Sequence, residues 1–99
     1  MALPIHFPPA ALGDICRRYG VRRLSLFGSV LRPEFRPDSD VDVLVEFDAR
    51  HSIGLIRLAA FQRELAALIG RAVDVRTPHD LSQYFRDDVL KSAVEQYAA

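Results

Sequence analysis

Residues 27–47, FGSVLRPEFRPDSDVDVLVEF, contain the pattern that decides the fold of this chain. Their last part, residues 40–47, alternates between apolar side chains and a mostly acidic set. A period of two is typical of a β-strand, so the two sets occupy opposite faces of that strand. The apolar face, which we expect to be buried, holds Val41, Val43, Val45 and Phe47. The opposite face holds Asp40, Asp42, Leu44 and Glu46.

The pair Asp40 and Asp42 is the first candidate for chemistry. Side chains two residues apart on a strand point the same way, with Cα atoms ~6.5–7 Å apart, and aspartate is depleted in strands. Two carboxylates on one face repel each other unless a cation lies between them. Mg²⁺ prefers oxygen ligands and often takes one or two carboxylates together with substrate phosphates. The D-x-D pattern alone is equally compatible with a polar, solvent-exposed strand face.

Upstream of this strand, Gly28 and Ser29 follow a second predicted strand, residues 21–27. Glycine lets the backbone approach a ligand closely, and the free N–H groups of a helical turn at residues 29–32 would point at an anion. A lone G-S is most often an ordinary turn, but here a spacer of ten residues separates it from the D-x-D. Adjacent strands would then bring a phosphate cradle beside a carboxylate pair. Asp74, in a short predicted strand at residues 72–76, is either a third carboxylate or an exposed strand residue.

The remaining parts of the sequence are predicted to be mostly helical. The apolar spacing predicts a helix from Pro8 and Pro9 that Gly20 ends, and another over residues 54–69 that Gly70 ends. The expected core faces are Leu12, Ile15, Cys16 and Tyr19 in the first helix and Leu55, Leu58, Phe61, Leu65, Leu68 and Ile69 in the second. A last helix, capped by Asp80 or Ser82, is expected to run to about Tyr97, with Phe85, Val89, Ala93, Val94 and Tyr97 inward. The predicted fold class is therefore α/β, a small mixed sheet of about three core strands with helices packed on it.

Composition limits the class of protein. The 99 residues, 49% hydrophobic and 26% charged, predict one globular domain over residues 1–99 and exclude a disordered tail or a disulfide scaffold. The 13 basic and 13 acidic residues cancel, which argues against holding nucleic acid through its phosphates. We see no signal peptide and no membrane-spanning pattern. With a single cysteine, Cys16, this predicts a cytoplasmic protein.

Together these residues resemble the signature of the DNA polymerase β-like nucleotidyltransferase superfamily, and most closely its minimal nucleotidyltransferase (MNT) domains. The resemblance covers nearly the whole chain and implies the nucleotidyltransferase fold. The matching G-S-x-x-R and S-D-x-D positions are Gly28, Ser29, Arg32, Ser39, Asp40 and Asp42. Pro33 departs from the family, which commonly carries a different residue there, often glycine.

The resemblance also implies roles for these residues. Asp40 and Asp42 would coordinate Mg²⁺ ions that bridge the triphosphate of ATP, and Asp74 would complete one metal site and help to activate the attacking hydroxyl. Gly28 and Ser29 would hold the β- and γ-phosphates, and Arg32 would neutralise phosphate charge. Ser39 belongs to the same nucleotide-binding motif.

MNT domains resemble one half of two-gene modules whose other half is a HEPN-domain RNase toxin. By that resemblance the chain is an antitoxin that forms a complex with its HEPN partner and transfers AMP from ATP to a tyrosine hydroxyl of the toxin. The expectation that 99 residues leave no room for an acceptor domain agrees with this. Two alternatives remain: an antitoxin that acts by binding alone, and a small-molecule adenylyltransferase of the aminoglycoside-modifying kind.

Overall fold

A computed structural model describes residues 5–32, 36, 39–48 and 53–99, with only the backbone of Ser29. The helices are α1 (Pro9–Tyr19), α2 (Leu55–Ile69) and α3 (Arg86–Ser92), with short 3₁₀ turns η1 (Gly28–Leu31) and η2 (Pro78–Asp80). The strands are β1 (Val21–Phe27), β2 (Val41–Phe47), β3 (Val73–Arg76) and β4 (Val94–Ala98). They form one mixed sheet in the order β3-β2-β1-β4, with β2 and β3 parallel and the other pairs antiparallel. Pro33 and the predicted loop 49–52 lie outside the described residues.

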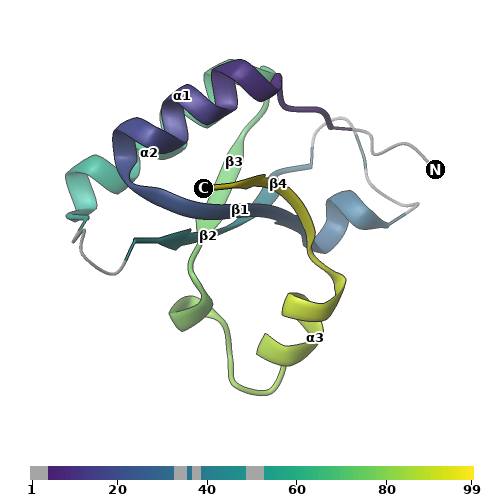
Figure 1. Ribbon diagram of the computed structural model, residues 1–99. Helices are drawn as coiled ribbons and strands as arrows, with labels where there is room; N and C mark the ends of the chain where they lie inside the picture. Colours follow the sequence, from purple (N-terminus) through teal and green to yellow (C-terminus); the bar gives the residue numbers. More distant parts are fainter. Residues whose placement is uncertain (1–4, 33–35, 37–38, 49–52) are drawn as a thin grey trace.

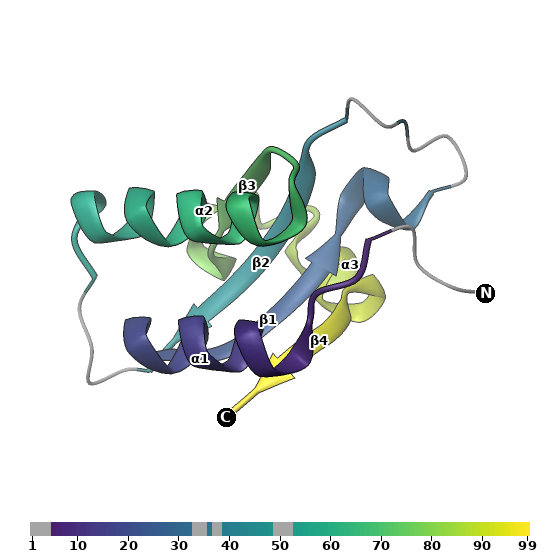
Figure 2. The ribbon, with the colours of Figure 1, turned by 90° about the horizontal axis from the view of Figure 1, so that it is seen from above.

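The core lies between the sheet and the two long helices, which lie side by side over one face of it (Figures 1 and 2). Val41, Val43 and Val45 are fully buried there, as the alternation of β2 predicts. Phe61 and Leu65 of α2 are also fully buried and belong to the same core cluster. The opposite face of β2 therefore carries Asp42, and below it lie η2 and α3 (Figure 1).

Most local predictions are confirmed. Gly20 and Gly70 end their helices in the left-handed conformation, with φ of 72° and 67°. Cys16 is fully buried, and burial raises the pKa of its thiol to about 12. Leu55 is an exception, because it is 85% exposed rather than part of the core. It lies in the first turn of α2, which extends past the end of β2 (Figure 2).

The prediction of a long last helix is wrong. The helical part is only α3, and residues 94–98 form the fourth strand, antiparallel to β1. Phe85 and Val94 are 59% and 38% exposed, so neither points inward as predicted. The physical reason is that β1 would otherwise present an unpaired edge, and pairing with β4 satisfies its backbone groups. The sheet therefore has four strands instead of about three.

Neither Asp80 nor Ser82 caps the last helix as predicted, because the N-cap position of α3 is Phe85. The carboxylate of Asp80 accepts hydrogen bonds from the backbone N–H and the hydroxyl of Thr77, at 3.0 and 3.1 Å. The backbone hydrogen bond from Thr77 is the main cause that lowers the pKa of Asp80. These contacts close the turn η2 directly after β3 instead of starting a long helix.

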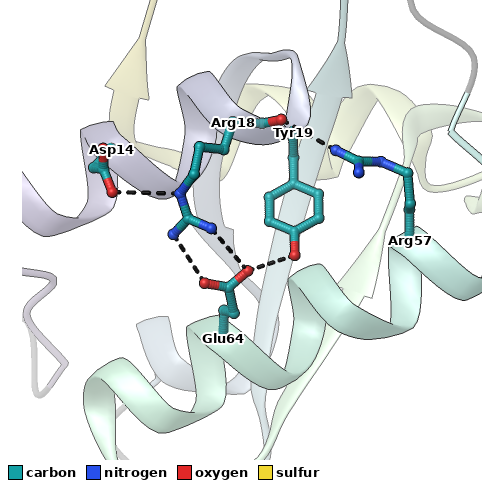
Figure 3. Close-up of polar contacts among 5 residues, drawn as sticks. All are labelled: Asp14, Arg18, Tyr19, Arg57 and Glu64. Atoms are coloured by element: carbon teal, nitrogen blue, oxygen red, sulfur yellow. Dashed lines mark hydrogen bonds and ion pairs between the residues drawn. The ribbon is translucent and has the colours of Figure 1, made fainter.

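A polar cluster joins the end of α1 to α2 (Figure 3). The guanidinium of Arg18 donates to both carboxylate oxygens of Glu64, at 2.9 and 3.3 Å, and the hydroxyl of Tyr19 donates to the same carboxylate. Arg57 lies 4.8 Å from the centre of the Tyr19 ring and donates to the backbone carbonyl of Arg18 at 3.1 Å. The hydrogen bonds from Arg18 and then Tyr19 lower the pKa of Glu64.

We expect the variant Glu64→Gln to melt a few degrees below the wild type at pH 7. Because the folded-state pKa of Glu64 lies below its ordinary value of 4.5, its charge stabilises the fold above that pH. The difference from wild type should shrink as the pH falls below 4.5 and the carboxylate of the folded state is protonated. Thermal unfolding at several pH values measures this. Glu95→Gln is the control, since its exposed ion pair with Arg23 should contribute little. A pH-independent difference for Glu64→Gln would contradict the role of its charge.

Candidate functional site

The predicted turn at Gly28 lies directly against the predicted carboxylates. Phe27, the last residue of β1, is paired with Asp42 of β2, so η1 starts beside that aspartate. Gly28 has a φ of +76°, and a Cβ at this position would lie 2.5 Å from the Oδ2 atom of Asp42. No side chain fits in that space, so only glycine allows the Asp42 carboxylate to lie against this backbone. The G-S turn and the D-x-D, separated by ten residues in sequence, therefore lie next to each other in the structure.

Asp74 reaches the same site through the parallel pairing of β2 and β3. Asp42 and Asp74 are direct partners in the register of these strands. In-register residues of neighbouring strands present their side chains on the same face, with the strands ~4.8 Å apart. Asp40 precedes β2 by one residue and is exposed, two residues before Asp42. The register thus sets Asp42 beside Asp74, while Asp40 lies just before the start of β2.

Asp74 has a cationic neighbour on its own strand. The Nη2 atom of Arg76 donates to the Oδ2 atom of Asp74 at 2.9 Å, in a half-exposed ion pair. Within the described part of the chain, no group of three or more His, Cys, Asp or Glu side chains is placed to hold a metal ion. Mg²⁺ often takes only one or two carboxylates when phosphates complete its coordination, and Asp40 and Asp42 are the right residue type for this. The donor set therefore fits Mg²⁺ with a nucleotide.

The segment before Asp40 is held by a residue that the sequence analysis did not identify. The Nη2 atom of Arg71, just after α2, donates to the backbone carbonyls of Arg36 and Ser39 at 2.7 and 2.8 Å. Next to it, the carbonyl of Ala72 accepts the backbone N–H of Val41 at 2.9 Å. Together these contacts fix the start of β2, where the aspartates begin. An arginine after a helix cap carries no local signal of such a role, which depends on the tertiary approach of two distant segments.

The other predicted nucleotide-binding residues lie at the ends of the loop between η1 and β2. The hydroxyl of Ser39 accepts the backbone N–H of Arg36 at 3.3 Å, and the Ser39 N–H donates to the Arg36 carbonyl at 3.0 Å. Ser39 thus closes a turn in the structure. Arg32 follows η1 and is exposed. The backbone of Ser29 lies in η1 next to Gly28, while its side chain lies outside the described residues.

A separate hollow lies at the other end of the same strands. Its volume is 420 Å³, and it is lined by residues 45–48 at the end of β2 and residues 77–79 after β3. None of the predicted site residues lines it. The carboxylates at the start of β2, not this hollow, therefore form the candidate site.

Among the described residues, no helix is long and apolar enough to cross a membrane.

Comparison with known proteins connects this geometry to a family. A family model described as "Nucleotidyltransferase domain" matches residues 10–95. The protein adenylyltransferase MntA of Thermococcus cleftensis is 36% identical over 81 residues, which cover 82% of this chain and 80% of that protein. A solved structure of a candidate minimal nucleotidyltransferase is 38% identical with a TM-score of 0.70, covering 86% of this chain and 84% of the other.

A more distant likeness concerns a complex. One chain from the complex of tri-AMPylated Shewanella oneidensis HEPN toxin with MNT antitoxin has a TM-score of 0.63 and is 17% identical. The likeness covers 92% of this chain and 70% of the other. At this identity the comparison shows the shared fold.

Proposed function

Since this chain belongs to the nucleotidyltransferase domain family, we propose that it is a Mg²⁺-dependent protein adenylyltransferase that transfers AMP from ATP to a tyrosine hydroxyl of a HEPN-domain toxin. It would act as the antitoxin of that pair, in the cytoplasm and in complex with its target. The single observation that carries the proposal is the contact between the Gly28 backbone and the Asp42 carboxylate, with Asp74 in register beside it. It supports the proposal because a turn that binds phosphate at Gly28 would lie next to carboxylates that hold Mg²⁺.

In the proposed reaction the tyrosine oxygen attacks the α-phosphorus of ATP and the bond to the β-phosphate oxygen breaks, so pyrophosphate leaves. Asp40 and Asp42 would hold Mg²⁺, which when bound supplies charge neutralisation for the entering and leaving oxygens. Backbone N–H groups at Gly28 and Ser29 would bind the β- and γ-phosphates, and Arg32 would add positive charge. Ser39 would help to bind the nucleotide by holding the end of the loop before Asp40, where its backbone carbonyl accepts a hydrogen bond from Arg71. Asp74 would complete one metal site and help to activate the hydroxyl by accepting its proton.

The choice of a protein as acceptor comes from the relatives. The Thermococcus cleftensis relative is named as a protein adenylyltransferase, and the Shewanella oneidensis complex joins an AMPylated HEPN toxin to an MNT antitoxin. Extending these roles to the present chain is part of the proposal. The geometry of the site supports nucleotidyl transfer as such, while the names of the relatives support the acceptor.

Titration of ATP into the purified chain tests the nucleotide and metal parts of this proposal. We expect calorimetry to detect binding in the presence of Mg²⁺ and little binding in EDTA, because the triphosphate would meet unshielded carboxylates without the ion. The control is a variant in which Glu46, on the same face of β2 but away from Gly28, is replaced by Gln. It should bind like the wild type. Equal binding in Mg²⁺ and in EDTA would contradict a metal-bridged triphosphate.

A further inference from the structure

Asp74, the third of the proposed metal-binding aspartates, forms an ion pair with Arg76. Both residues lie on β3, two positions apart, so their side chains share the face that carries Asp42. Arg76 donates to Asp74 at 2.9 Å, and the side chains are 51% and 38% exposed. The Asp74 carboxylate is therefore engaged with the positive charge of Arg76.

A guanidinium and a divalent cation compete for the same carboxylate oxygen. An ion pair exposed to this degree contributes little to stability, so it opens at small cost when a better partner arrives. Until then it hinders a cation in two ways, because it occupies a ligand oxygen and places a like charge nearby. A bound triphosphate would change this balance, since arginine pairs well with phosphate oxygens.

We propose that Arg76 is a positioning residue that holds Asp74 in the nucleotide-free protein and releases it when the metal and nucleotide bind. Asp74 then becomes available to the reaction only with the nucleotide present, and binding of a divalent cation alone is weakened. This inference rests on the proposed function, because it concerns the same site. It adds a residue that the G-S and D-x-D pattern does not contain.

The test measures binding of Mn²⁺ alone, without nucleotide, to the full chain by calorimetry or electron paramagnetic resonance. We expect Arg76→Gln to bind Mn²⁺ ~3–10-fold more tightly than the wild type, because both the competing contact and the like charge are removed. Arg76→Lys, which keeps the charge and can still reach the carboxylate, should remain close to the wild type. Arg23→Gln is the matched control, since Arg23 is a similarly exposed arginine of the sheet whose ion partners are Glu46 and Glu95. Its Mn²⁺ affinity should not change.

A second pair of variants tests whether the gain in Mn²⁺ affinity depends on Asp74. In the variant Asp74→Asn, the further change Arg76→Gln should raise Mn²⁺ affinity by less than half of the gain seen with Asp74 present, since the carboxylate to be released is gone. An equal gain in both backgrounds would overturn the proposal, as would unchanged affinity in Arg76→Gln or no Mn²⁺ binding by any variant. Failure of the proposed function is a separate result. In that case the Mn²⁺ affinities would follow the expected pattern, but no nucleotide would be transferred to the partner.

Discussion

Replacing Asp40 and Asp42 together with Asn should lower AMP transfer at least ~10³-fold, or ~4 kcal/mol in the barrier. Asparagine nearly preserves the shape of each side chain but removes the charge that would hold Mg²⁺, and with it most of the charge stabilisation of the transition state. The melting temperature should change little or rise slightly, because two like charges on neighbouring positions of one face repel. Thermal unfolding, co-purification with the partner and transfer from labelled ATP are measured on the same variant.

The control for the double aspartate variant is Asp87→Asn with Asp88→Asn, which removes the same amount of charge from the exposed first turn of α3. It should keep full transfer. A large fall in the melting temperature of the Asp40 and Asp42 variant would mean that these aspartates are structural. Unchanged transfer would mean that the reaction uses other carboxylates.

The second large effect is expected for Gly28→Ala. Alanine in the left-handed conformation costs ~1–2 kcal/mol, and at this position its Cβ would lie 2.5 Å from the Oδ2 atom of Asp42. The carboxylate or the turn must move, which we expect to destabilise the fold by ~1–3 kcal/mol beyond the backbone cost. Because a displacement of about 1 Å at a reacting group can cost ~10²-fold in rate, transfer should fall at least that much. Chemical unfolding and labelled-ATP transfer measure the two effects.

Gly70→Ala separates these two causes. Gly70 has almost the same φ, +67°, but a Cβ there would meet nothing within 4 Å. This variant should lose only the backbone contribution to stability and should keep its transfer activity. If both glycine variants lost the same stability and both retained transfer, the close contact between Gly28 and Asp42 would have no functional meaning.

Strong local signals in the sequence led to correct predictions. The alternation of residues 40–47 identified the buried face of β2, and the glycines after α1 and α2 marked both helix ends. These features depend on neighbouring residues alone, so their physical causes are visible in a short window. The G-S turn and the D-x-D are local patterns too, and the roles assigned to their residues stay predictions.

The remaining features depend on distant contacts. The apolar residues of the C-terminal segment fit a helical spacing. Residues 94–98 nevertheless form a strand, because they pair with the edge of β1. The strand register that sets Asp42 beside Asp74 also follows from tertiary structure. The same holds for the contacts of Arg71 with the segment before β2 and of Arg76 with Asp74. A short window of sequence contains no signal that predicts these contacts.

The mass of the HEPN-domain partner after co-expression tests the central proposal most directly. Partner made with the wild-type chain should carry the added mass of one or more AMP groups on tyrosine, and partner made with the Asp40→Asn, Asp42→Asn variant should carry none. Partner that stays unmodified with the wild-type chain while its toxicity is still blocked would contradict the account. The chain would then act as an antitoxin by binding alone.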